Sequence, residues 1–271
     1  MTETNTSNSK IDLSGTHIVV TGSSSGIGLA MAEGLLRVGA TVALASKPGV
    51  KLDNQVKRLK LSGLDAYGLP MDVRSETSIA DSVKWVQRTW GKLDVLVNNA
   101  GIGMQTINKR FMIEPQPFFQ VTPDGFRNLI DTNLTGYFLV ARGFTPLMIE
   151  QGYGKIINIT TNDETMRCKG FIPYGPSRAG AESLSYIMAE DLRPYGITVN
   201  MLLPGGVTDT GMIPEELKGQ ITFPLLRPRV MIEPIIFLAS GKSDGITAER
   251  ITAIEFSKWL ASLRLTYRLR E

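Results

Sequence analysis

Cysteine and histidine are almost absent from this chain of 271 residues, which contains one of each, Cys168 and His17. A single cysteine cannot form an intrachain disulfide, and one cysteine with one histidine excludes a metal site built from these two residue types. We therefore expect no metal and interpret Cys168 as a structural thiol. The lack of disulfides fits a reducing compartment, so we expect a cytoplasmic protein.

A large excess of charge and long apolar runs are also missing. Lys and Arg number 29 against 26 Asp and Glu, the net charge is +3, and no basic patch is visible, so we expect no nucleic-acid partner. No apolar run approaches the roughly 20 residues of a membrane-spanning helix, so we expect no membrane partner. Residues 1–10 are polar, lack the apolar core of a signal peptide, and predict a disordered tail.

Short runs rich in Val, Ile and Leu alternate with amphipathic segments along the rest of the chain. Strands are predicted at residues 16–21, 41–45, 65–69, 93–98, 155–159, 198–203 and 250–254. Helices are predicted at residues 27–38, 54–61, 75–90, 124–150 and 175–193. Nearly continuous apolar strands suit a sheet that is covered on both faces. We predict one α/β domain over residues 11–255, a Rossmann-type, doubly wound parallel sheet of about seven strands with helices on both faces.

Three segments do not fit simple connections. Residues 102–122 and 205–228 follow the fourth and sixth strands, and long segments at strand carboxyl ends are where α/β sheets build ligand sites. Phe111, Phe118 and Phe119 in the first segment either cover a substrate or make a subunit contact. Residues 256–271 form a C-terminal extension, which we expect to pack on the domain or on a neighbouring subunit.

A glycine-rich turn, Thr21-Gly22-Ser23-Ser24-Ser25-Gly26-Ile27-Gly28, follows the first strand and opens a helix. Gly22 suits a tight turn, and Gly26 and Gly28 suit close approach of a pyrophosphate and of the helix to the strand. Backbone N–H groups at the helix start would then face the phosphates. The alternative is a Gly/Ser loop without a ligand. We predict dinucleotide contacts from Gly22, Ser24, Ser25, Gly26, Ile27 and Gly28.

The end of the second strand carries Ser46 and Lys47 and no acidic residue. A site that prefers NAD usually has an acidic residue there, which holds the ribose 2′-hydroxyl. Ser46 and Lys47 suit a 2′-phosphate instead, so we favour NADP(H) over NAD(H) as the cofactor. The alternative is that Lys47 is an ordinary solvated lysine.

Tyr174 and Arg178 are four residues apart in Tyr174-Gly175-Pro176-Ser177-Arg178, a spacing that places both on one face of a helix. A fixed positive charge beside a phenol favours the phenolate, so the pair indicates general acid/base chemistry.

Together these motifs resemble those of the short-chain dehydrogenase/reductase family over about residues 11–254. Asp72-Val73 matches the pair that contacts adenine in that family, and Asn98-Asn99-Ala100-Gly101 matches its Asn-Asn-Ala-Gly signature. Pro204-Gly205-Gly206-Val207-Thr208-Asp209-Thr210 resembles the motif that contacts the nicotinamide carboxamide, through either Thr208 or Thr210. The resemblance implies further cofactor contacts from Asp72, Val73, Asn99, Ala100, Gly101, Tyr174, Arg178, Pro204, Gly205, Val207 and Thr208.

The resemblance also implies a catalytic set of Asn, Ser, Tyr and Lys. Asn133 matches the Asn that anchors a proton-relay water, and Tyr174 matches the acid/base. Thr161 occupies the position of the Ser, thirteen residues before Tyr174, and Arg178 occupies that of the Lys. A Thr hydroxyl polarises a carbonyl as Ser does, but its methyl group narrows the pocket.

Arg178 departs from the family in one function. An arginine can hold the nicotinamide ribose and supply a positive charge, but it is too basic to pass a proton to solvent. Two hypotheses follow. The first is an NADP(H)-dependent oxidoreductase that interconverts a small-molecule carbonyl and a secondary alcohol, with Tyr174 as acid/base. The second is a catalytically attenuated or inactive dinucleotide-binding protein.

A lyase or isomerase on the same scaffold is less favoured, because the cofactor motifs are complete. The resemblance further implies a homo-oligomer, a dimer or tetramer formed through the helices near residues 124–150 and 175–193. The charged residues that follow Thr161 either line the pocket mouth or form a solvated loop.

Overall fold

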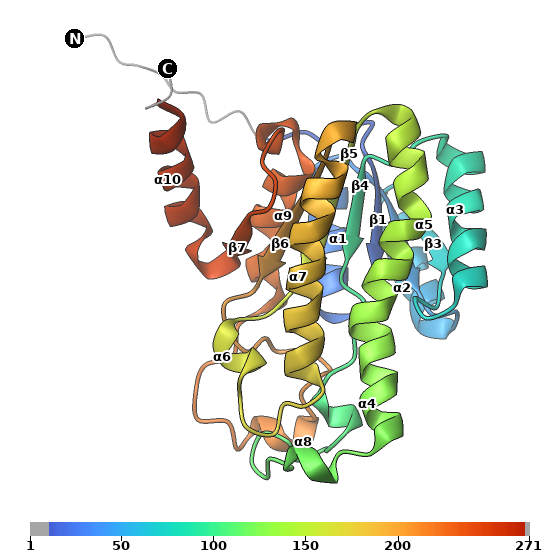
Figure 1. Cartoon of the computed structure of the whole chain (residues 1–271). Helices are drawn as coiled ribbons and strands as arrows, with labels where there is room; N and C mark the ends of the chain where they lie inside the picture. The colour runs from blue at the N-terminus through green and yellow to red at the C-terminus, as the bar shows by residue number, and fades with distance from the viewer. Residues whose placement is uncertain (1–10, 269–271) are drawn as a thin grey trace.

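The computed structural model describes residues 11–268, with side chains to residue 263. The predicted tail at residues 1–10, and residues 269–271, lie outside the described part. A seven-stranded sheet forms the centre of the molecule, in the order β3-β2-β1-β4-β5-β6-β7, and every strand pair is parallel (Figure 1). Its strands are β1 (His17–Thr21), β2 (Thr41–Ser46), β3 (Ala66–Pro70), β4 (Val95–Asn98), β5 (Gly154–Ile159), β6 (Ile197–Leu203) and β7 (Arg250–Thr252).

Helices cover both faces of the sheet. One face is covered by α1 (Gly26–Leu36), α2 (Val50–Leu61) and α9 (Ile232–Ala239), and the other by α3 (Glu76–Trp90), α5 (Gly136–Gln151) and α7 (Tyr174–Leu192) (Figure 1). Ile18 and Val20 of β1 face the first layer, whereas Val19 faces the second, and all three are fully buried. Burial on both faces explains why most strand positions are apolar, without alternation between apolar and polar residues. The predicted fold class is confirmed.

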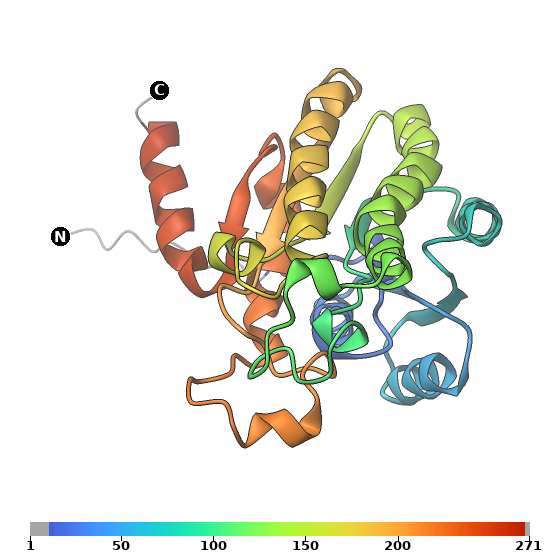
Figure 2. The ribbon, with the colours of Figure 1, turned by 60° about the horizontal axis from the view of Figure 1, so that its bottom comes forward.

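The strand order reverses between β1 and β4, because the chain winds outward from β1 in both directions. Ligands of open α/β sheets bind at such a switch point, outside the carboxyl ends of the strands. That end of the sheet is the lower one in Figure 1, where the short helices α6 (Asp163–Met166) and α8 (Glu215–Lys218) also lie. The segments 102–122 and 205–228 lie there side by side, as Figure 2 shows in green and orange.

The segment predicted as one long helix at residues 124–150 is helical throughout, but one internal turn is π-helical. It consists of α4 (Pro123–Ile130), a π-helical turn (Asp131–Thr135) and α5. The Thr122 hydroxyl caps α4 by accepting a hydrogen bond from the Gly125 N–H at 3.1 Å. Single π-helical turns inside α-helices are frequent at functional sites, and this one carries Asn133.

The sequence analysis assigned no helix to α6, α8 or α9. The α9 sequence, Ile-Glu-Pro-Ile-Ile-Phe-Leu-Ala, has no helical period and contains a proline, so it gives no periodic signal. The C-terminal extension begins as α10 (Phe256–Arg268), and Phe256 and Trp259 pack on Phe237 of α9 with ring centroids 5.5 and 5.8 Å away. The described side chains of α10 thus contact this chain's own domain.

Candidate active site

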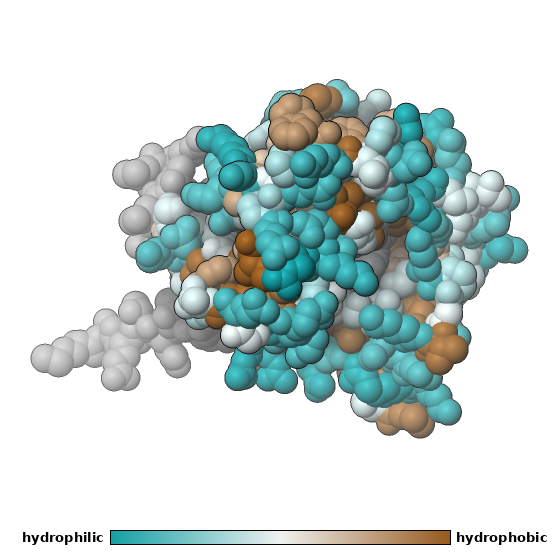
Figure 3. Space-filling view, turned by 90° about the horizontal axis from the view of Figure 1, so that it is seen from below, coloured by the Kyte–Doolittle hydropathy of each residue, from teal (hydrophilic) through white to brown (hydrophobic). Residues whose placement is uncertain are grey.

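A cavity of about 390 Å³ lies at the carboxyl end of the sheet, against the switch point. Figure 3 looks at this end of the molecule and shows hydrophobic side chains among polar ones around a central hollow. The cavity joins the glycine turn to the start of α7 and to both inserted segments. The predicted site residues that line it are Gly22, Ser25, Gly26, Ile27, Gly28, Asn99, Gly101, Thr161, Tyr174, Arg178, Pro204, Val207 and Thr208.

The glycine turn is pressed against the end of β4. A Cβ atom on Gly28 would lie 2.4 Å from Asn99 Nδ2 and 2.6 Å from the Gly22 carbonyl oxygen, so only glycine fits. Gly22 and Gly26 have φ angles of 65° and 59°, in the left-handed region that favours glycine. Ser25 precedes α1 and makes no side-chain cap, which leaves the first N–H groups of the helix for a ligand. This geometry fits a pyrophosphate.

The end of β2 lies directly beside this turn. The Ser24 N–H donates to Ser46 Oγ at 3.1 Å, and Lys47 Nζ lies 3.6 Å from Asp72 Oδ2. Arg74 donates two side-chain hydrogen bonds to the same carboxylate, and these bonds hold the pKa of Asp72 down, at about 2. Two cations therefore surround one carboxylate at the position where a 2′-phosphate is expected.

Tyr174 is the first residue of α7, and Arg178 follows one turn later on the same face, as predicted. The guanidinium carbon lies 5.2 Å from the centroid of the Tyr174 ring and 5.5 Å from that of the Tyr137 ring. Arg178 is only 3% exposed. Its Nη1 donates to the Tyr137 hydroxyl at 2.8 Å and to the Ile159 carbonyl at 3.0 Å, and the Tyr137 hydroxyl donates to the same carbonyl at 3.0 Å.

The buried charge of Arg178 is only partly satisfied by these contacts. No carboxylate of the described residues forms an ion pair with it, and its Nε is buried without a hydrogen-bond partner there. Burial alone would lower the pKa of Arg178, but the phenols of Tyr137 and Tyr174 more than reverse this, so the pKa is raised. A Cβ on Gly101 would lie 2.5 Å from Arg178 Nη2, so glycine keeps this space open. An unpartnered donor beside a cavity fits a ligand that brings hydroxyl acceptors, as a ribose does.

The end of β5 is fixed by a network that reaches Arg250 of β7. Arg250 Nη2 donates to the Thr161 carbonyl at 2.9 Å and to Asp163 at 3.1 Å, and its Nε contacts both oxygens of Glu182 at 3.0 Å. The Thr160 hydroxyl donates to Glu182 at 2.8 Å. The Thr161 hydroxyl has only a long contact of 3.5 Å with Asn162, so it remains available to a ligand.

Asn133 lies behind the cavity wall instead of in it. Its Oδ1 accepts a hydrogen bond from the Ile102 N–H at 2.8 Å, and its Nδ2 donates to the Ile102 carbonyl at 2.9 Å. Both contacts fix the start of the first inserted segment. Other predicted residues also lie outside the cavity wall, namely Ser24, Ser46, Lys47, Asp72, Val73, Ala100 and Gly205.

The sequence analysis missed several residues at this site. Lys51 of α2, Gln105, Thr165 and Phe171 line the cavity. The charged residues of the segment just after Thr161 do not, namely Asp163, Glu164, Arg167 and Lys169. Tyr137 was missed because its role depends on Arg178, which is remote in sequence. Cys168, interpreted as a structural thiol, is a free and exposed cysteine.

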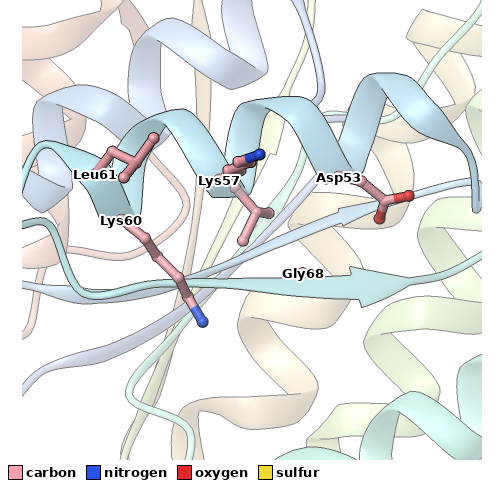
Figure 4. A pocket seen from close by; sticks show the side chains of 6 residues that line it. Asp53, Lys57, Lys60, Leu61 and Gly68 are labelled. Carbon is pink, nitrogen blue, oxygen red and sulfur yellow. The ribbon is translucent and has the colours of Figure 1, made fainter.

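A second hollow, of about 450 Å³, lies between α2 and the edge strand β3 (Figure 4). Its wall consists of Asp53, Val56, Lys57, Lys60, Leu61 and Gly68, and no hydroxyl or aromatic side chain belongs to it. It therefore offers no comparable chemistry. Within residues 11–268 no group of three or more His, Cys, Asp or Glu side chains is placed to hold a metal, and no helix has the length and apolar character needed to cross a bilayer.

The fold and the cavity define a doubly wound α/β protein with a candidate ligand site at its glycine turn, at the carboxyl end of the sheet. The short chain dehydrogenase family model matches residues 16–220, and this chain belongs to that family. It is 31% identical to a 3-oxoacyl-[acyl-carrier-protein] reductase of Aquifex aeolicus, over 89% of this chain and 97% of that protein. It is 33% identical to a gluconate 5-dehydrogenase of Gluconobacter oxydans, over 71% and 72% of the two chains. A solved structure of an actinorhodin polyketide ketoreductase variant with NADPH matches with a TM-score of 0.77 at 26% identity, covering 88% of this chain and 95% of that one. These findings support carbonyl/alcohol oxidoreduction with a pyridine nucleotide.

Proposed function

We propose that this protein is an NADP(H)-dependent oxidoreductase that interconverts a carbonyl and a secondary alcohol. The observation that carries the proposal is that Tyr174, Thr161 and Arg178 line the same cavity as the glycine turn. A bound nicotinamide supplies or accepts the hydride. In the reducing direction the substrate carbon gains that hydride and the oxygen gains a proton, so the substrate takes up the two electrons that the reduced dinucleotide loses.

The protein's own groups divide the remaining work. Tyr174 donates the proton to the substrate oxygen, and the Thr161 hydroxyl donates a hydrogen bond to the same oxygen. A positioned proton donor accelerates such a step by about 10²–10⁴-fold. The positive charge of Arg178, 5.2 Å from the Tyr174 ring, stabilises negative charge that develops on the phenol. Its unpartnered Nε supports a role in holding the ribose.

The preference for NADP(H) rests on the charges at the end of β2. Lys47 and Arg74 both pair with Asp72, so the group keeps a net positive charge beside Ser46. A phosphate is better matched to this group than a ribose hydroxyl is, because Arg and Lys bind phosphate with charge-assisted hydrogen bonds. Lys51, at the start of α2, adds a further cation on the cavity wall.

One observation favours the second candidate, a dinucleotide-binding protein with weak or no turnover. Arg178 Nη1 is engaged by Tyr137 and by the Ile159 carbonyl, and the raised pKa of Arg178 keeps it protonated. Proton relay through this position is therefore closed, and the proton of Tyr174 must be resupplied by another route.

One set of measurements separates the two candidates. NADPH and NADH are titrated by fluorescence, and a carbonyl panel is assayed with the natural protein, with Tyr174→Phe and with Arg178→Lys. Turnover by the natural protein that is lost in Tyr174→Phe supports the enzyme. Tight NADPH binding without turnover, restored by Arg178→Lys, supports the second candidate. Failure to bind either dinucleotide refutes both, and tighter NADH binding refutes the cofactor preference alone.

We also propose that the protein forms a homo-oligomer through α5 and α7. Both helices expose apolar side chains, among them Phe138, at 46%, and Ile187, at 58%. Tyr186 and Ile149 add to this surface at 43% and 37% exposure. Sedimentation of the natural protein and of Ile187→Glu tests the assignment. A monomeric natural protein, or a variant with unchanged assembly, would count against it.

A further inference from the structure

The part of the cavity that adjoins Tyr174 has apolar walls. Met104, Phe111 and Met112 of the first inserted segment line it, together with Met212 and Ile213 of the second and with Phe171. Met104 is 2% exposed and Phe111 is 8% exposed, so both are fixed parts of the wall. The ring of Phe171 lies 5.6 Å from that of Phe111 and 6.4 Å from that of Tyr174, so an aromatic surface leads away from the acid/base group. Met side chains fill irregular gaps and adapt to different apolar ligands.

Charged and polar groups are scarce at this end of the cavity. Within the described chain, the cavity wall contains two charged side chains, Lys51 and Arg178. Lys51 belongs to α2 and lies at the end of the cavity that contains the glycine turn. Arg178 Nη1 already donates hydrogen bonds to the Tyr137 hydroxyl and the Ile159 carbonyl. Besides Tyr174, the polar groups near the apolar walls are Gln105 and a few threonine hydroxyls. No cation is therefore free to bind a substrate carboxylate there.

From this polarity we infer that the substrate is a ketone, or the matching secondary alcohol, whose body beside the carbonyl is a linear or cyclic hydrocarbon. We expect a polyhydroxylated keto acid to bind poorly, because the apolar walls offer partners to few of its hydroxyls and no free cation to its carboxylate. This inference rests on the proposed oxidoreductase function and specifies its substrate class. Each CH2 group that enters an apolar site is worth about a fourfold gain in affinity.

The test compares a series of 2-alkanones with 5-keto-D-gluconate, a polyhydroxylated keto acid. Dissociation constants are measured by calorimetry on the NADP-loaded protein and, in parallel, on the protein without nucleotide. kcat/KM is measured with NADPH. We expect about 16-fold tighter binding of 2-hexanone than of 2-butanone, from two added CH2 groups, and binding of the keto acid at least about 100-fold weaker than that of 2-octanone. Affinity that does not rise with chain length, or equal or better binding of the keto acid, overturns the inference.

A matched pair of variants locates the effect. Met212→Gln keeps the shape of a half-buried wall residue but makes it polar, and we expect it to weaken 2-octanone binding about tenfold. Met188→Gln makes the same change at a half-buried position of α7 outside the cavity, and binding should stay within twofold of the natural protein. Equal losses in the two variants would contradict the assignment. Because binding needs no turnover, chain-length-dependent affinity without activity would support an apolar ligand at this site while refuting the proposed oxidoreductase.

Discussion

Replacing Tyr137 by Phe tests the central contact of the site. The Tyr137 hydroxyl accepts a hydrogen bond from Arg178 Nη1 at 2.8 Å and donates one to the Ile159 carbonyl at 3.0 Å, and both residues are almost completely buried. Phe keeps the ring and removes only the hydroxyl. Loss of a buried hydrogen bond to a charged group costs about 1.5–3 kcal/mol. For a chain of this size, that corresponds to a fall in Tm of about 3–12 °C.

The measurement is urea unfolding of the nucleotide-free protein at one fixed protein concentration, with the midpoint and slope compared between variants. Tyr195→Phe is the matched control, because Tyr195 is 47% exposed, and we expect a change within about 0.5 kcal/mol. Tyr137→Phe, Arg178→Met and the double variant complete a cycle, and we expect a coupling free energy of about 1–2 kcal/mol. A Tyr137→Phe protein as stable as the control, or a coupling near zero, would refute the contact.

The remaining predictions concern the turn, the end of β2 and the network around β5. Because the pKa of Asp72 is lowered from 3.8 to about 2, its stabilising contribution is present above about pH 4 and is lost as the pH falls toward 2. Asp72→Asn should therefore lower the free energy of unfolding by about 1–2 kcal/mol at pH 7, after allowance for partial exposure. It should also flatten the pH dependence of this free energy between about pH 4 and 2, and an unchanged pH dependence there would contradict the prediction. A Cβ atom at residue 28 would lie 2.4 Å from Asn99 Nδ2, so Gly28→Ala should weaken NADPH binding in the fluorescence titration by about tenfold or more. An unchanged Kd would show that the turn accommodates the added methyl group without losing its ligand geometry. Arg250→Met removes the hydrogen bond to the Thr161 carbonyl and should lower kcat by about 10–100-fold with an unchanged Kd for NADPH; equal losses in both would indicate general unfolding of the site instead.

Much of the architecture could be predicted because its determinants are local. The strands are largely apolar runs of three to seven residues, and their alternation in sequence with amphipathic helices is enough to predict a parallel sheet. The glycine turn could be located because Gly22 and Gly26 require backbone angles that other residues avoid. Where local signals were weak, features were missed, as for the π-helical turn within residues 124–150 and for α9 with its internal proline.

The composition of the candidate site could be predicted only in part. Tyr174 and Arg178 share one helix, so their spacing alone placed them together. The residues that restrain them come from remote segments, because Tyr137 lies 41 residues from Arg178 in the chain and Arg250 lies 89 residues from Thr161. The apolar walls of the cavity likewise come from two inserted segments, Met104 from one and Met212 from the other, which meet only in the folded protein.

The sequence by itself determined the parallel sheet, the glycine turn and the helical pair Tyr174–Arg178, because periodicity, backbone freedom and i,i+4 spacing act within a few residues. The tertiary structure alone decided that Arg178 is a buried charge held by Tyr137 and the Ile159 carbonyl, that Asn133 fixes Ile102, and that the ligand cavity is apolar beside Tyr174. These features depend on burial and on contacts between distant segments, and both are set only when the chain packs.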